Sequence, residues 1–161
     1  MPQETTAAQI MRTKLVTLTP SMTVMEATEL LLRHSISGAP VLDQNGSLVG
    51  ILSELDCVSD ILNSSMNNSP IELVESVMTR DVVTVAPDTN LTTLAHMFSS
   101  KRFRRLPVVD EQGRLLGQLS RRDLMKALYD IMIVSEKRSS SPLFFSAVYD
   151  SDEIPAKFVT G

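Results

Sequence analysis

The chain has few of the residues on which metal centres and disulfide frameworks depend. Its 161 residues include one cysteine, two histidines and no tryptophan. Cys57 alone cannot form an internal disulfide, and a structural zinc site needs more thiols or imidazoles than these residues supply. No apolar run approaches the roughly 20 residues of a membrane span, and the N-terminus lacks the basic and apolar stretches of a secretory signal. We therefore expect a soluble, cytoplasmic protein with no metal site and no membrane partner.

Positive charge is also scarce, because the formal net charge is −4 and the isoelectric point is near 5.1. This balance argues against a nucleic-acid or membrane-surface binder. The exception is the basic stretch 101–105, which in isolation is typical of a solvated edge. Phe103 lies among its arginines as a stacking residue would, so direct nucleic-acid binding stays as a minority alternative.

Catalytic signatures are missing too. No glycine-rich phosphate loop, nucleophile elbow or metal-ligand pair occurs in the sequence. His34 and His96 both fall in helix patterns, and Cys57 is typical of a small core residue. We expect no enzymatic activity and no catalytic cofactor.

What the chain does contain is nearly the same sequence twice, with a constant offset of 67 residues and no gap. A fixed period of this kind indicates a repeated structural unit. The matching residues are mostly turn-forming and polar, which chance does not explain. The first copies are Met11, Pro20, Pro40, Asp43, Gly46, Gly50, Ser53 and Asp56, and the second copies are Met78, Pro87, Pro107, Asp110, Gly113, Gly117, Ser120 and Asp123.

Each repeat predicts a β-α-β-β-α unit preceded by a short helix, and hence an α+β fold. Capping boxes at 6–9 and 69–72 predict the short helices, and prolines end the extended segments 15–19 and 82–86. Further helices begin at Thr23 and Asn90, hairpins span 39–52 and 106–119, and last helices begin at Ser53 and Ser120. We expect the two units to pack through their sheets with pseudo-two-fold symmetry. The predicted boundaries are 7–63 for repeat one, 64–70 for a linker, 71–135 for repeat two and 136–161 for a tail.

Two segments indicate partners. The helix over 124–134 is apolar nearly all round, with Lys126 and Asp130 as its charged residues, and such a helix needs cover on more than one side. A second copy of the chain is the simplest cover, so we expect a homodimer. The tail holds four of the seven aromatics, at Phe144, Phe145, Tyr149 and Phe158. It is predicted to pack back as an arm, with a docking peptide for another protein as the alternative.

The pattern Gly-x-x-Ser-x-x-Asp ends each hairpin, with Ser53 and Asp56 in repeat one and Ser120 and Asp123 in repeat two. Serine followed three residues later by an acid is close to a capping box, which is a purely structural interpretation. The functional interpretation is a nucleotide site, since helix N-terminal amides favour phosphate and a first-turn carboxylate can accept hydrogen bonds from a ribose diol.

The ordered set of these motifs, present twice, resembles a tandem pair of CBS (cystathionine β-synthase) domains, also called a Bateman module. The resemblance extends from about Ile10 to Ile133. The segments that carry it are 10–11, 77–79, 38–43, 105–110, the turns at Pro20 and Pro87, and the two Gly-x-x-Ser-x-x-Asp stretches. It implies clefts between the repeats that bind AMP, ADP or ATP, with S-adenosylmethionine as another ligand. It also implies pairing of two modules into a disc.

The resemblance further implies roles for individual residues. Ribose is held by Ser53 and Asp56 in one cleft and by Ser120 and Asp123 in the other. Adenine lies against Val16, Ala39, Val83 and Leu106. Phosphates meet Lys101, Arg104 and Arg105 in repeat two, where repeat one offers His34. This uneven distribution of positive charge predicts one dominant phosphate-binding cleft. Gln118 departs from the family pattern, in which an aliphatic residue follows the glycine.

We therefore expect a regulatory, energy-sensing module that binds an adenine nucleotide and acts through an unidentified protein partner. The main alternative is a dimerising scaffold whose clefts are vestigial. An enzyme is a further alternative, disfavoured by the missing catalytic signatures.

Overall fold

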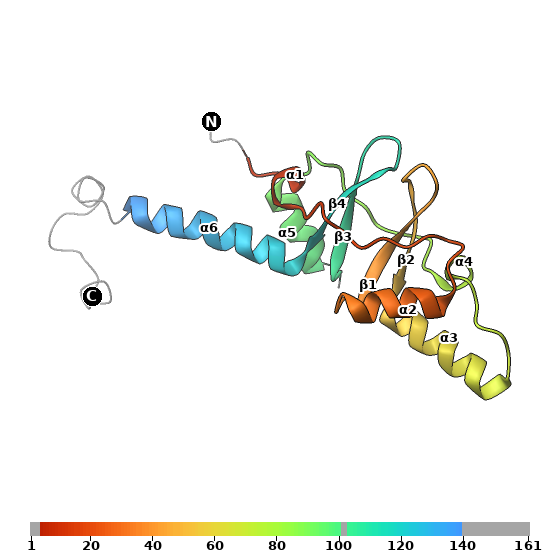
Figure 1. The fold of residues 1–161 in the computed structure, drawn as a ribbon. Coiled ribbons are helices and arrows are strands. Elements are labelled where there is room, and N and C mark those ends of the chain that lie inside the picture. The colour runs from red at the N-terminus through yellow and green to blue at the C-terminus, as the bar shows by residue number, and fades with distance from the viewer. Residues whose placement is uncertain (1–3, 101–102, 140–161) are drawn as a thin grey trace, which may run out of the picture. The chain divides into compact units, whose positions relative to one another are not determined.

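The computed structural model describes residues 4–100 and 103–139 of the chain. Two units are distinguished, residues 1–124 and 125–161, and the first contains both hairpins. The elements in order are α1 (Ala7–Ile10), α2 (Val24–Arg33), β1 (Gly38–Leu42), β2 (Leu48–Ser53), α3 (Glu54–Asn67), α4 (Val74–Val77), α5 (Leu91–Ser100), β3 (Arg105–Val109), β4 (Leu115–Ser120) and α6 (Arg121–Ser139). This mixture of helices and two small antiparallel sheets confirms the predicted α+β class (Figure 1).

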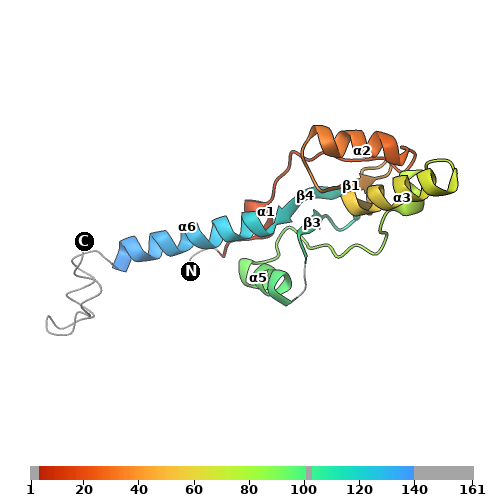
Figure 2. The same ribbon diagram turned by 90° about the horizontal axis from the view of Figure 1, so that it is seen from below.

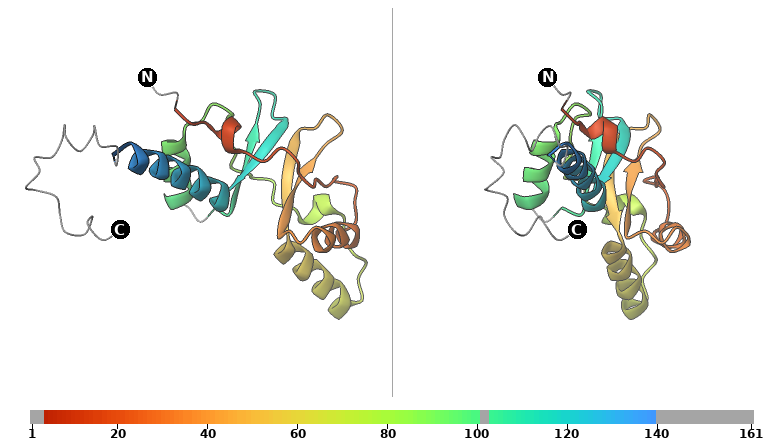
Figure 3. Two further views of the ribbon diagram at one scale, coloured as in Figure 1. Left: turned by 60° about the vertical axis from the view of Figure 1, so that its left-hand side comes forward. Right: turned by 90° about the vertical axis from the view of Figure 1, so that its left-hand side faces the viewer.

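The two hairpins form as the turn chemistry predicts. β1 pairs with β2 from Gly38↔Ser53 onward, and β3 pairs with β4 in the same register. In the first turn, the Asp43 carboxylate accepts hydrogen bonds from the amides of Asn45 and Ser47 at 2.8 and 3.0 Å. Gly46 has a φ of +77°, which favours glycine because it has no Cβ. The hairpins lie side by side with their turns at the same end (Figure 3).

The predicted strands at 15–19 and 82–86 are wrong in extent, because each contributes a single parallel bridge, Leu18↔Val41 and Val85↔Val108. The Leu18 amide donates to the Pro40 carbonyl, and the Leu42 amide donates to the Leu18 carbonyl, both at 2.9 Å. The next hydrogen bond in either direction would need an N–H on Pro40 or on Pro20, and proline has none. Prolines therefore limit this third strand to one rung.

Most helix starts agree with the predicted caps. Thr23 and Ser53 close capping boxes on α2 and α3, and the Asn90 side chain accepts from the Thr93 amide at 2.8 Å. The capping box predicted at 69–72 does not form, since α4 begins at Val74. The Glu72 amide instead donates to the buried carboxylate of Asp60. The helix α3 continues to Asn67, so the first part of the predicted 64–70 linker is helical.

Each short helix at the start of a repeat packs on the other repeat. The amides of Ala7 and Ala8 donate to the carbonyls of Thr89 and Pro87. In the same way, the amides of Val74 and Glu75 donate to the carbonyls of Met22 and Pro20. The repeats therefore exchange their N-terminal arms, defined here as residues 6–12 and 73–79.

Backbone bridges between the repeats come in pairs that the 67-residue period relates. Thr6↔Asn90 corresponds to Thr23↔Leu73, and Arg12↔Gln118 corresponds to Ile51↔Thr79. At the hairpin turns, Leu48 donates to Gly113 while Leu115 donates to Gly46. Reciprocal pairs of this kind are what pseudo-two-fold symmetry requires.

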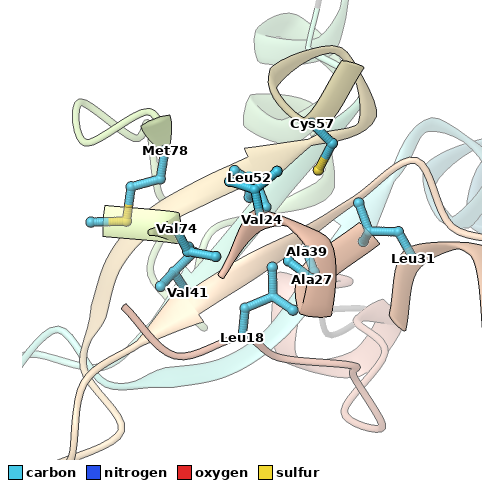
Figure 4. Packing of buried hydrophobic residues seen from close by; sticks show 10 residues of the cluster. All are labelled: Leu18, Val24, Ala27, Leu31, Ala39, Val41, Leu52, Cys57, Val74 and Met78. Atoms are coloured by element: carbon cyan, nitrogen blue, oxygen red, sulfur yellow. The ribbon is translucent and has the colours of Figure 1, made fainter. Parts of the chain in front are cut away.

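The arm exchange extends into the hydrophobic core of repeat one. Val74 and Met78 from the second arm belong to the same buried cluster as Leu18, Val41 and Leu52 (Figure 4). The other members are Val24, Ala27, Leu31, Ala39 and Cys57. Cys57 is a core residue, and burial raises the pKa of its thiol. α2 and α3 lie together beside this hairpin (Figure 2). Because this core includes residues of the other repeat, repeat one is not complete alone.

The repeated methionines and glycines mark where each arm crosses a strand. A Cβ added to Gly117 would lie 2.6 Å from Met11 Sδ and 2.8 Å from the Arg12 carbonyl oxygen. A Cβ on Gly50 would meet Met78 Sδ at 2.5 Å. Glycine is thus required at both crossings by close approach rather than by its backbone angles.

No helix among the described residues is both long enough and apolar enough to cross a bilayer.

We predict that Gly117→Ala lowers the free energy of unfolding by about 1–3 kcal/mol, because the added methyl group overpacks the arm crossing. Urea unfolding of the full chain measures this. Gln112→Ala in the exposed turn of the same hairpin is the control, and its effect should stay within about 0.5 kcal/mol. Equal stability of the two variants would contradict the crossing as a tight contact.

Candidate functional site

Two clefts form where residues of both repeats meet. The first, the Ser53 cleft, is a cavity of about 460 Å³ at the end of β2 and the start of α3. Its lining combines the apolar Ala39 and Ile51 with the cationic Arg104 and Arg105. The remaining lining residues are Ser37, Gly38, Ser53, Glu54, Leu55 and Gln118.

The second, the Asp123 cleft, is a cavity of about 630 Å³ at the end of β4 and the start of α6. Both cleft volumes fall in the range of small-molecule sites. The cationic residues that line the Asp123 cleft are Arg12, Lys14, Arg105 and Arg122. The remaining residues are Leu15, Val16, His34, Ser35, Ile36, Gly38, Pro40, Gln118, Ser120 and Asp123.

Arg105 lies between the two clefts and lines both. Its guanidinium donates from Nη1 to the Gly38 carbonyl at 2.6 Å and from Nη2 to Ser37 Oγ at 3.1 Å. Arg105 and Gly38 are 67 residues apart and so occupy equivalent places in the two repeats. The arginine of one repeat thus crosses to the backbone of the other, next to a residue without a side chain.

The repeated serine and aspartate form the capping geometry in both repeats. Asp123 Oδ2 accepts from the Ser120 amide at 2.9 Å and from Ser120 Oγ at 2.7 Å. Asp56 Oδ2 accepts the same two hydrogen bonds from Ser53, both at 2.8 Å. The capping interpretation is therefore confirmed, and it engages one oxygen of each carboxylate.

The other oxygen distinguishes the two aspartates. Asp123 Oδ1 accepts a hydrogen bond from Arg12 Nε at 3.0 Å, in an ion pair between the arm and α6. Burial raises the pKa of Asp123, but hydrogen bonds from Ser120 and Arg12 outweigh that effect and bring the pKa below its ordinary value. Asp123 is therefore a carboxylate at neutral pH.

The symmetric backbone carries an asymmetric charge. The Asp123 cleft has four cationic side chains and one carboxylate, while the Ser53 cleft has Arg104 and Arg105 opposed by Glu54. At the places equivalent to Arg12, Lys14 and Arg122, the other repeat has Thr79, Asp81 and Leu55. Positive charge is thus concentrated in one cleft, where a polyanion would be attracted most strongly.

The predicted site residues are distributed over both clefts. Ser53, Ala39, Arg104 and Arg105 line the Ser53 cleft, and Val16, His34, Ser120 and Asp123 line the other. Three predicted residues lie outside both linings: Asp56, which caps α3, Val83, which is exposed, and Leu106, which is fully buried. Lys101 lies outside the described residues.

The sequence prediction missed Arg12, Lys14 and Arg122, which supply most of the positive charge of the Asp123 cleft. The prediction considered basic residues only in the stretch before β3. A comparison of the repeats residue by residue shows that each stands opposite a neutral or acidic residue 67 positions away, but it does not show that the three side chains line one cleft.

Chemically, the Asp123 cleft combines a hydrogen-bond acceptor for hydroxyl groups, cations for phosphate and an apolar wall of Leu15, Val16 and Ile36. No cluster of three or more potential metal ligands occurs in residues 4–100 and 103–139.

Comparison with known proteins places this geometry in a family. A 17.7 kDa uncharacterised protein of Acidianus ambivalens is 35% identical over 127 residues, which are 79% of this chain and 75% of that protein. The Arabidopsis thaliana protein CBSX2, solved in complex with AMP, is 34% identical with a TM-score of 0.70, covering 79% of this chain and 98% of that one.

A further solved structure is the CBS domain pair of the protein MJ0100, in complex with 5-methylthioadenosine and S-adenosyl-L-methionine. It is 26% identical, with a TM-score of 0.66 over 80% of this chain and 98% of that one. The CBS domain model matches residues 7–63 and 74–130. The chain therefore belongs to the CBS domain family and carries two CBS domains in tandem.

Proposed function

We propose that the chain binds an adenine nucleotide in the Asp123 cleft and serves as a regulatory module without catalytic activity of its own. The observation that carries this proposal is the concentration of four cationic side chains around Asp123 and Ser120 at the start of a helix. Cations and helix N-terminal amides both favour phosphate, and a carboxylate accepts hydrogen bonds from a ribose diol.

Each part of a nucleotide has a matching group in this cleft. Asp123 and Ser120 are assigned to the ribose, and Arg12, Lys14 and Arg122 to the phosphates. The adenine is assigned to the apolar wall that includes Val16. His34 lines the same cleft and is assigned to the phosphate side as a weaker donor.

The Ser53 cleft is proposed as a second, weaker site. Ser53 and Ala39 are assigned to ribose and adenine, and Arg104 and Arg105 to phosphate. Glu54 opposes a polyanion there, and Arg104 is the one cation among the described residues of its lining that it does not share with the Asp123 cleft. We therefore assign the dominant phosphate site to the Asp123 cleft.

Support comes from the relatives, since CBSX2 was solved with AMP and the MJ0100 domain pair with S-adenosyl-L-methionine and 5-methylthioadenosine. An output from such a module passes through a protein partner whose affinity changes with the ligand. A dimerising scaffold with empty clefts is the competing function, and ligand binding distinguishes the two.

Isothermal titration of the full chain with AMP, ADP, ATP and S-adenosylmethionine tests the proposal. We predict saturable binding of at least one adenine nucleotide. Asp123→Asn should weaken AMP binding roughly tenfold to a hundredfold, because the amide removes a charged hydrogen-bond acceptor.

Asp56→Asn is the matched control, because Asp56 makes the same cap bonds but does not line either cleft. Both variants should melt at a similarly lower temperature, and Asp56→Asn should retain AMP binding in the Asp123 cleft. If both variants bind AMP as the wild type does, Asp123 is a cap and nothing more. Absence of any nucleotide binding by the wild type would support the scaffold.

We also propose that the chain forms a homodimer through its last repeat helices. Val58, Leu62 and Met66 are exposed and lie four residues apart on α3. At the equivalent places, α6 carries Met125, Tyr129 and Ile133. An apolar row that the repeat reproduces on both helices suits a two-fold partner, because an isologous interface uses the same surface of both copies.

We predict that Leu62→Glu or Met125→Glu weakens dimerisation at least roughly tenfold, because an unpaired charge would be buried in the interface. Light scattering at tens of micromolar measures the mass. Asn63→Glu is the control, since Asn63 is exposed on α3 but lies off the apolar row. A monomeric wild type would contradict the homodimer and leave the row for a different partner.

A further inference from the structure

Arg12 is one of the residues that distinguish the Asp123 cleft from the Ser53 cleft, and its side chain is paired with Asp123. Its backbone is fixed on β4 by two hydrogen bonds, from the Arg12 amide to the Gln118 carbonyl at 2.9 Å and from the Gln118 amide to the Arg12 carbonyl at 3.0 Å. The equivalent residue in the other repeat is Thr79, which makes the same backbone bridge to Ile51. Both repeats thus form this backbone bridge, but the guanidinium is present in repeat one, at Arg12, and not at Thr79.

The two members of the Arg12–Asp123 ion pair differ in their exposure to solvent. The Arg12 side chain is 64% exposed, whereas the Asp123 side chain is 11% exposed. Two hydrogen bonds from Ser120 fix the position of the carboxylate. The guanidinium lies on the solvent side of the carboxylate. Because most of the Arg12 side chain faces solvent, water can replace Asp123 as its partner, whereas the buried carboxylate needs another donor such as a ligand hydroxyl.

A ligand hydroxyl that approaches Asp123 Oδ1 meets Arg12 there as a competitor. An unphosphorylated nucleoside must displace the guanidinium and gives it no new anionic partner. A phosphorylated nucleoside also displaces it, but its phosphate can accept a charge-assisted hydrogen bond from Arg12 in place of the one that Asp123 accepted. Arg12 therefore opposes the first ligand and assists the second.

We propose that Arg12 makes the Asp123 cleft select phosphorylated over unphosphorylated nucleosides by exchanging its carboxylate partner for a phosphate. This proposal rests on the proposed nucleotide function of the cleft. Arg12 is in this proposal a specificity-determining residue. It lowers the affinity for adenosine and raises the affinity for AMP, although the two ligands have the same base and sugar.

The test is titration of the full chain with AMP and with adenosine. Arg12→Met keeps much of the side-chain volume and removes the guanidinium. It should weaken AMP binding roughly tenfold and strengthen adenosine binding about two- to fivefold, because Asp123 is then free. Arg12→Lys should restore part of the AMP affinity.

Lys14→Met is the matched control, because Lys14 lines the same cleft and makes no hydrogen bond or ion pair with any described residue. It should weaken AMP binding and leave adenosine binding unchanged. If Arg12→Met weakens both ligands or leaves adenosine unchanged, the partner exchange is wrong although the nucleotide function stands. If the wild type binds neither ligand, the nucleotide function itself is wrong, and the exchange with it.

Discussion

The exchange of N-terminal arms between the repeats is the constraint on which the rest of the structure depends. Each arm crosses a strand of the opposite repeat at a glycine, and in the second arm Val74 and Met78 complete the core of repeat one. A unit of about 60 residues buries so little surface that it is only marginally stable on its own. The exchange makes one body from two such units and brings Arg12, at the end of the first arm, to the start of α6.

Pseudo-symmetry of the backbone does not extend to the electrostatics. The bridges between repeats occur in pairs, and both aspartates cap their helices in the same way. The side chains that line the clefts have diverged, with arginine or lysine in one repeat opposite threonine, aspartate or leucine in the other. The duplicated scaffold thus provides two clefts at equivalent places whose linings differ in charge, and the proposed dominant phosphate site rests on this difference.

Much of the fold could be predicted from the sequence, because its signals are local. The turns at Gly46 and Gly113 and the caps at Thr23 and Ser53 depend on residues within a few positions of one another. The prediction of a helix start at 69–72 was wrong because a residue distant in sequence determines the structure there. The Glu72 amide donates a hydrogen bond to the Asp60 carboxylate, and no helix begins at this segment. In the candidate site, Ser120 and Asp123 could be found from their motif. Arg12, at the end of the exchanged arm, and Lys14, two residues further along the chain, line the same cleft, and no motif encodes this placement.

A crystal structure of the protein with AMP tests the central claim most directly. The account predicts AMP in the Asp123 cleft, with its ribose hydroxyls bonded to Asp123 and its phosphate among Arg12, Lys14 and Arg122. AMP bound in the Ser53 cleft alone, or an Asp123 cleft that stays empty at saturating AMP, would contradict it.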